Sequence, residues 1–172
     1  MDVKKPFFKV KKFKESAKVP SKRKEDAGYD IYGCFEEDFK VLKTGELWLC
    51  PTGIGCEIPE DWVFFLSERG STGIKGISKR AGIIDSGFRG EIFVILNNTS
   101  DKDVIFAKHE GAALAVFCEE NNIDEMKVTI YPQSKAVAQA LILYCPHIDV
   151  EEVSELSDNS ERGSGVIGSS NK

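Results

Sequence analysis

Hydrophobic positions along this chain fall in short runs rather than at helical spacing. Runs rich in Val, Ile, Phe, Trp and Tyr are separated by Gly, Pro, Asp and Asn, as strands are separated by turns. The clearest predicted strands are residues 62–66, 92–96, 128–131 and 141–144. Only residues 136–143 could form a helix, and their β-rich end and the following Pro146 make a buried strand an equal alternative. Many short strands at close spacing predict an all-β sandwich, barrel or jelly roll.

The length of 172 residues fits one domain, and a change in composition near residue 154 divides it. We expect a β domain over residues 1–153 and an arm over residues 154–172. The arm is rich in Ser, Gly, Asn and Glu, so it should be mobile in the free protein. It ends in Glu161–Ser170, a glycine-rich string with an arginine and several hydroxyls, which suits a segment that folds over phosphates.

The charge of the chain bears on the class of function and is unevenly distributed. The formal net charge of −5 disfavours a dedicated nucleic-acid binder. Residues 4–24 are densely basic and residues 149–161 are acidic, which predicts solvated surfaces or, for the basic run, attraction of a polyanionic substrate. No apolar run is long enough to cross a bilayer, and the charged N-terminus lacks a signal-peptide pattern, so we expect a cytoplasmic protein with no membrane partner.

Cysteine and histidine residues form no recognisable reactive pattern. The five cysteines include no Cys-x-x-Cys pair and no histidine at zinc spacing, which fits reduced thiols in a cytosol. His109 and His147 have no serine or cysteine in an activating context, so a nucleophilic side chain is disfavoured.

The most informative string is Ala81–Ile92, read as AGIIDSGFRGEI. It places Asp85 three residues before Phe88, between glycines, where a turn gives way to an apolar strand. A carboxylate in a tight turn beside an aromatic ring suits a small-molecule site. The string strongly resembles the third motif of the dUTPase family, the trimeric all-β enzymes that hydrolyse dUTP to dUMP and pyrophosphate.

This resemblance implies roles for the residues of the turn. Asp85 would orient and deprotonate the attacking water and touch the sugar 3′-hydroxyl, which a carboxylate within hydrogen-bond reach can do. Phe88 stands in place of the family's usual tyrosine and would pack under the deoxyribose. The backbone around Gly82, Ile83 and Ile84 would read the uracil edge.

Two earlier strings are similar to the first and second motifs of the family. By this resemblance, Asp30 of residues 27–31 (AGYDI) would lie near the magnesium-bound triphosphate of the substrate. Residues 69–73 (RGSTG) would bind the phosphates through Arg69, Gly70 and Ser71. Gly70 departs from the family, which usually has a serine there. Either string alone is a weak signal.

The fourth motif has two candidates. Residues 111–116 have the glycine and the apolar run, but Val116 stands where the family has glutamine; residues 138–144 keep the glutamine, so we choose Gln139. This choice implies an insertion over about 107–133 relative to compact members. In phage-like members, the resemblance would place an extra partner-binding function there.

The fifth motif is the C-terminal string. Arg162 would hold the γ-phosphate, Ser169 would add a hydroxyl, and Gly168 belongs to the same substrate-covering stretch. Ile167 replaces the family's aromatic residue and can cover the base only by dispersion and apolar burial. Val166 replaces a glycine.

The resemblance to the dUTPase family therefore predicts a jelly-roll or β-clip barrel that forms a homotrimer. The three sites would lie at subunit interfaces, and the arm of a neighbouring subunit would close each one. Mg²⁺ would be held mainly by the substrate phosphates, with Asp30 as its protein contact, either directly or through water. The first alternative is a regulatory protein of the same fold that binds a protein partner, such as a repressor, through residues 107–133. The second, a dCTP deaminase, is disfavoured because that family's catalytic glutamate would fall at Ile95, and Glu91 comes too early.

Overall fold

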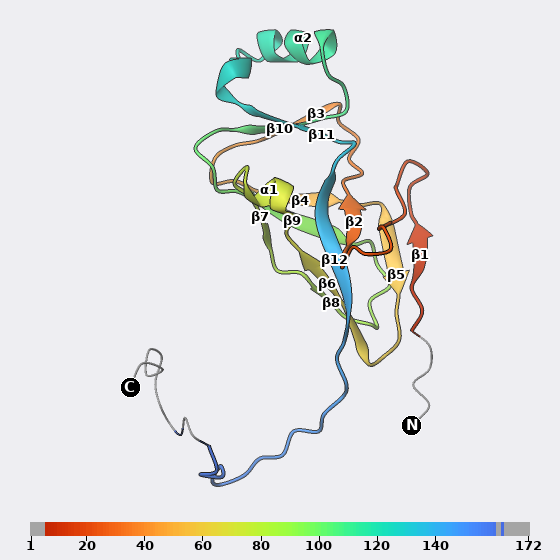
Figure 1. Cartoon of the computed structure of the whole chain (residues 1–172). Helices are drawn as coiled ribbons and strands as arrows, with labels where there is room; N and C mark the ends of the chain where they lie inside the picture. The colour runs from red at the N-terminus through yellow and green to blue at the C-terminus, as the bar shows by residue number, and fades with distance from the viewer. Residues whose placement is uncertain (1–5, 161–162, 164–172) are drawn as a thin grey trace.

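The computed structural model describes residues 6–160 and 163, and β-strands make up most of its regular structure (Figure 1). The strands are β1 (Lys9–Lys12), β2 (Tyr29–Tyr32), β3 (Phe39–Leu42), β4 (Leu47–Pro51), β5 (Ile54–Glu57), β6 (Trp62–Ser67), β7 (Ile77–Arg80), β8 (Ile83–Ile84), β9 (Phe93–Asn98), β10 (Val104–Ala107), β11 (Thr129–Pro132) and β12 (Ala136–Tyr144). The helices are α1 (Gly70–Gly73), α2 (Ala112–Glu120) and the 3₁₀ helix η1 (Glu125–Lys127). None of these helices is long and apolar enough to span a membrane.

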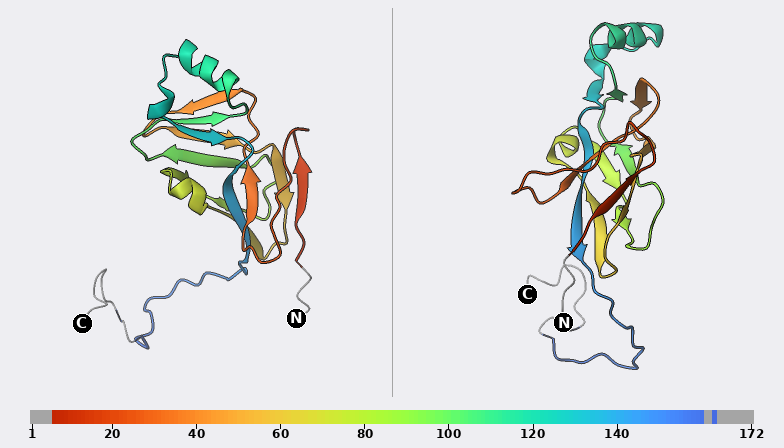
Figure 2. Two further views of the ribbon diagram at one scale, coloured as in Figure 1. Left: turned by 45° about the horizontal axis from the view of Figure 1, so that its top comes forward. Right: turned by 90° about the vertical axis from the view of Figure 1, so that its right-hand side faces the viewer.

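The strands form four small sheets, in the orders β1-β5, β11-β10-β3, β2-β12-β6-β8 and β4-β9-β7. All pairs are antiparallel except β10 with β11. The long strand β12 lies between β2 and β6 and continues away from the sheet that carries β10 and β11 (Figures 1 and 2). Helix α2 lies at the end of the molecule opposite the exposed residues 145–160, which form no helix or strand.

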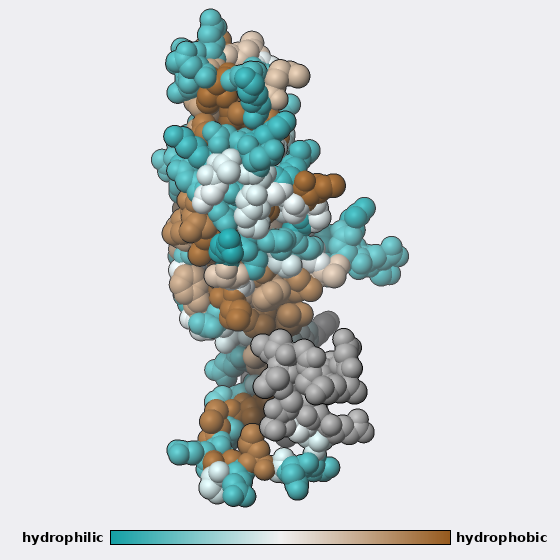
Figure 3. Space-filling model, turned by 90° about the vertical axis from the view of Figure 1, so that its left-hand side faces the viewer, coloured by the Kyte–Doolittle hydropathy of each residue, from teal (hydrophilic) through white to brown (hydrophobic). Residues whose placement is uncertain are grey.

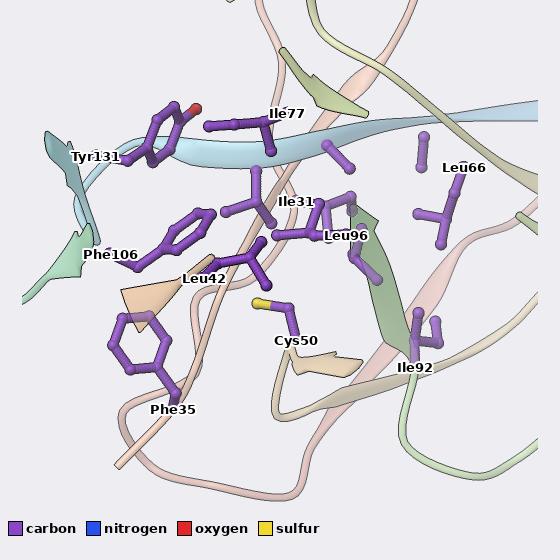
Figure 4. Packing of buried hydrophobic residues seen from close by; sticks show 14 of the residues in the cluster. Ile31, Phe35, Leu42, Cys50, Leu66, Ile77, Ile92, Leu96, Phe106 and Tyr131 are labelled. Atoms are coloured by element: carbon purple, nitrogen blue, oxygen red, sulfur yellow. The ribbon is translucent and has the colours of Figure 1, made fainter. Parts of the chain in front are cut away.

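The core lies between the sheets and is filled by side chains from most of the strands (Figure 4). Phe64 and Leu66 of β6 are buried while their neighbours along the strand are partly exposed, which is the period of two expected for a half-buried strand. Phe106 is fully buried and its ring packs 5.0 Å from Trp48 and 5.4 Å from Tyr131, measured between ring centroids. Each such side chain stabilises the fold by roughly 1.5–3 kcal/mol relative to exposure.

The all-β fold predicted from the sequence is confirmed, and the four predicted strands correspond to β6, β9, β11 and β12. The ambiguous residues 136–143 form a strand. Helix α2, by contrast, was not anticipated, because it is only nine residues long and buries just Leu114 and Cys118. Its stability comes from tertiary packing, including the ring of Phe117 stacked 4.5 Å from that of Phe39.

Candidate functional site

A hollow of about 740 Å³ lies where β2, β12 and α1 meet. Polar and small residues from three separate segments line it: Ser21, Lys22, Arg23, Asp26, Ala27, Gly28, Asp30, Arg69, Gly70, Ser71 and Gln139. The sequence-predicted residues of the first, second and fourth motifs are thus brought together in one place. Pairing of β2 with β12 and of β12 with β6 produces this arrangement, because Gln139 lies opposite both Asp30 and Ser67.

Asp30 and Arg69 form a two-pronged ion pair in this hollow. Arg69 Nε lies 3.1 Å from Asp30 Oδ1, and Nη2 lies 3.5 Å from Oδ2. The two side chains are about one-third exposed, at 28% for Arg69 and 34% for Asp30. The guanidinium therefore has a fixed direction while part of it remains open to a ligand.

The backbone around Arg69 is also fixed by local contacts. Strand β6 ends at Ser67, and Arg69 then caps α1. The Arg69 amide donates to Thr72 Oγ1 over 3.2 Å, and Thr72 Oγ1 donates to the Arg69 carbonyl over 2.9 Å. Thr72 is buried, and Arg69 Nη1 contacts Ser71 Oγ at 3.3 Å. The two hydrogen bonds to Thr72 hold the turn that presents the guanidinium and the Ser71 hydroxyl to the hollow.

Gln139 is held beside Asp30 by its own amide. Nε2 donates to the Glu68 carbonyl over 2.7 Å, which leaves Oε1 as an acceptor facing Gly28. A Cβ on residue 28 would lie only 2.7 Å from that oxygen, so glycine permits the close approach of β2 and β12 here. The rejected alternative, Val116, lies on α2 and does not line the hollow.

The third-motif turn is built at the edge of the same sheet as β2 and β12. Strand β8 pairs with β6, and the Leu66 amide donates to the Gly82 carbonyl over 2.8 Å. Gly82 has a φ of +131°, a conformation that favours glycine. The Phe88 amide donates to the Asp85 carbonyl over 3.0 Å, closing the turn. Asp85 is exposed, and so are Ile83 at 70% and Phe88 at 43%.

The structure does not bring this turn to the hollow of the same chain. Gln139 lies opposite Ser67, whereas Ile84 lies opposite Phe64 on the far side of β6. Asp85 is then displaced from Gln139 by two strand spacings and about four residues, or roughly 16 Å. That gap is far beyond hydrogen-bond reach. Asp85 therefore does not contact the residues that line the hollow of its own chain.

Further residues at the hollow were not singled out from the sequence. Lys22, Arg23 and Asp26 line it; the basic run over residues 4–24 was the only signal for the two cations, and Asp26 had none. Hydrogen bonds from Arg23 lower the pKa of Asp26. Tyr131, which had no signal, is buried below Arg69. Its hydroxyl donates to the Ala136 carbonyl over 2.6 Å, and Arg69 Nη1 donates to the same oxygen over 3.3 Å.

The described residues contain no group of three or more His, Cys, Asp or Glu side chains that could hold a metal ion. Asp30 is the predicted magnesium contact, and both of its oxygens face Arg69. This donor set fits a Mg²⁺ ion that keeps most of its waters and is bound mainly by phosphates. Arg162, Ile167, Gly168 and Ser169, predicted for the fifth motif, lie outside the described residues.

The catalytic glutamate expected of a dCTP deaminase is absent, because position 95 is an isoleucine and the nearby Glu91 has a different role. Glu91 Oε1 accepts a hydrogen bond of 2.8 Å from the Gly53 amide, so this carboxylate ties two backbone segments together. Ile95 lies on β9, where it pairs with Leu49 and Arg80.

Comparison with known proteins gives a consistent result. The family model described as dUTPase matches residues 14–131. The chain is 30% identical to the deoxyuridine 5′-triphosphate nucleotidohydrolase of Leptospira interrogans, over 93% of this chain and 95% of that one. It is 34% identical to the Clostridioides difficile protein of the same name, over 94% and 96%.

The fold is also that of a solved phage protein. The structure of Staphylococcus bacteriophage 80alpha dUTPase with dUPNHPP superposes with a TM-score of 0.75 at 25% identity, covering 96% of this chain and 99% of that chain. Its description states that phage dUTPases control transfer of virulence genes by a proto-oncogenic G protein-like mechanism.

Proposed function

Because the chain belongs to the dUTPase family, we propose that it hydrolyses dUTP to dUMP and pyrophosphate, limiting uracil incorporation into DNA and supplying dUMP. The observation that carries the proposal is the convergence of Asp30, Arg69, Ser71 and Gln139 on one polar hollow. An arginine fork, a hydroxyl and an amide together suit a chain of phosphates.

In this proposal the hollow holds the phosphates. Arg69 offers its guanidinium, already oriented by Asp30, and Ser71 and Gln139 add neutral polar groups that fix the phosphate chain. Binding there places the α-phosphorus for in-line attack and offsets the charge that develops on its oxygens. Little reorganisation is needed, because the ion pair and the amide are already in place.

The turn at the sheet edge supplies the water and reads the nucleoside. Asp85 is the general base that takes a proton from the attacking water. Phe88 packs under the deoxyribose, and the backbone of Gly82, Ile83 and Ile84 recognises uracil. The exposure of Ile83 and Phe88 supports this role, since a bound nucleoside would cover both.

A homotrimer would complete the site. The separation of roughly 16 Å between Asp85 and Gln139, estimated above from the strand pairing, supports an assembly in which one chain provides the hollow and its neighbour provides Asp85. The arm of a further chain, with Arg162, Ile167, Gly168 and Ser169, would close over the nucleotide.

Magnesium fits the same site. When bound, Mg²⁺ would neutralise phosphate charge during attack at the α-phosphorus. Asp30 would hold it through water, since both carboxylate oxygens already face Arg69. The protein's own residues would orient the phosphates and activate the water.

The test is pyrophosphate release from dUTP, dCTP, dTTP and UTP in parallel with Mg²⁺, with deamination of dCTP monitored. We expect release from dUTP alone. Replacing Asp85 with Asn should abolish release while leaving the fold unchanged, because Asp85 is exposed. Normal turnover by Asp85→Asn would refute the role of Asp85 as the base. Deamination of dCTP would show that the protein is a deaminase and would refute the proposed hydrolysis.

A regulatory role is the second candidate, in which residues 107–133 bind a protein partner such as a repressor. Helix α2 and β3 form an apolar hollow of about 610 Å³ lined by Phe39, Val116 and Phe117, among others, and Val116 is 53% exposed. Val116→Lys should leave dUTP hydrolysis unchanged and abolish binding of a repressor if this hollow is its site. Equal repressor affinity of the wild type and Val116→Lys would contradict this location.

A further inference from the structure

The segment between β1 and β2 forms one wall of the phosphate hollow. Ser21 and Gly28 begin and end this wall, and the Asp30 amide donates to the Ser21 carbonyl over 2.8 Å. The segment projects from the body of the molecule (Figure 2, right). Figure 3 shows a strongly hydrophilic projection on the same side of the protein. The hollow therefore has a charged outer wall in addition to the predicted motif residues.

This wall is held by its own contacts. Arg23 binds Asp26 with two charged hydrogen bonds of 3.0 Å, and the Arg23 amide donates to Asp26 Oδ2 over 3.1 Å. Lys22 Nζ donates to the Asp26 carbonyl over 2.8 Å and lies 5.0 Å above the ring of Tyr29. The Lys22 ammonium is therefore held at the rim, and binding an anion there would cost little additional side-chain entropy.

Among the cations that line the hollow, Lys22 is the one that forms no ion pair with a carboxylate within residues 6–160. Three cations line it, and two of them, Arg23 and Arg69, are each paired with a carboxylate, Asp26 and Asp30. Among the ion pairs of residues 6–160, Lys22 has none, and the oxygens around its ammonium are neutral carbonyls. A polyanion entering the hollow would meet this charge without displacing a carboxylate from it.

We propose that Lys22 is a substrate-positioning residue that binds the phosphates beyond the α-phosphate. The inference rests on the proposed dUTP hydrolysis. The α-phosphorus must face the turn that carries Asp85, and that turn lies outside the hollow of the same chain. The two remaining phosphates therefore occupy the hollow, between Arg69 on one wall and Lys22 at the rim of another.

The test compares Lys22→Ala with Lys24→Ala. Lys24 is a neighbouring lysine of the same segment, is exposed and does not line the hollow. Lys22→Ala should raise the KM for dUTP about tenfold with little change in kcat, which is the effect of losing one charge-assisted contact to the substrate. Lys24→Ala should leave KM unchanged. Inhibition by dUMP, which has only the α-phosphate, should be the same in both variants and in the wild type, and Lys22→Arg should recover most of the affinity.

A merely structural lysine would give a different pattern. If Lys22 only ties the segment to the Asp26 carbonyl, Lys22→Ala would weaken dUMP and dUTP equally, and that result overturns the proposal. Identical KM values for Lys22→Ala and Lys24→Ala also overturn it. If the wild type releases no pyrophosphate from dUTP, the proposed function itself fails. Calorimetric binding of inorganic pyrophosphate would then still test Lys22, since the wild type should bind it about tenfold more tightly than Lys22→Ala.

Discussion

Gly28 should be essential because it allows Gln139 to lie against β2. A methyl group at residue 28 would lie 2.7 Å from Gln139 Oε1, 3.2 Å from Cδ and 3.0 Å from Cβ. The amide could rotate away only by losing its 2.7 Å hydrogen bond to the Glu68 carbonyl, and Cβ cannot move without moving β12. Gly28→Ala should therefore destabilise the protein by about 2 kcal/mol, within the usual range for overpacking.

That loss corresponds to a fall in Tm of about 4–8 °C for a chain of this size. Thermal unfolding should be followed at one fixed protein concentration, since assembly makes Tm depend on concentration. Pyrophosphate release should fall by about 10–100-fold, because Gln139 would be displaced from the phosphates. Gly73→Ala is the control, since nothing lies within 4 Å of its added methyl group.

A double variant separates the clash from a general effect of alanine at residue 28. In Gln139→Ala the Oε1 and Cδ contacts are gone, so adding Gly28→Ala should cost less than half of its effect in the wild type. An equal loss in both backgrounds would refute the argument, and so would full activity and unchanged Tm in Gly28→Ala alone.

Three further predictions concern the core and the thiols. Phe106→Ala should lower the free energy of unfolding by about 3–5 kcal/mol in urea, because it empties a fully buried ring site; a loss below about 1 kcal/mol would contradict that packing. Tyr131→Phe removes the hydrogen bond to the Ala136 carbonyl and should cost about 1 kcal/mol, with a smaller fall in activity than Arg69→Ala. Of the five thiols only Cys145 is exposed, and burial raises the pKa of Cys56, so a thiol reagent should label one cysteine in the folded protein and none in Cys145→Ser.

The sequence was most informative where local patterns determine structure. Alternating and β-branched runs located β6, β9 and β12, and the strings around Asp30, Arg69 and Asp85 carried the candidate site before any contact was known. Gln139 was chosen because the family resemblance calls for a glutamine beside an apolar run in the fourth motif. The structure adds that this residue lies opposite Asp30.

What the sequence lacked was information on long-range contacts. Helix α2 depends on packing against β3 and β10, and Tyr131 and Arg69 come together where both donate to the Ala136 carbonyl. Lys22 could be recognised as basic, but its place at the hollow depends on the pairing of Ser21 with Asp30. None of these contacts leaves a periodicity or motif in the chain.

The central claim is that the hollow of one chain works with Asp85 of another, and mixing two inactive variants tests it most directly. Arg69→Ala damages the hollow and Asp85→Asn damages the turn, so each alone should be inactive. After subunit exchange at equal concentrations, an intact hollow should meet an intact Asp85 in about one quarter of the sites, and dUTP hydrolysis should recover to about one quarter of the wild-type rate. No recovery in a mixture shown by native mass spectrometry to contain mixed assemblies would contradict the shared site.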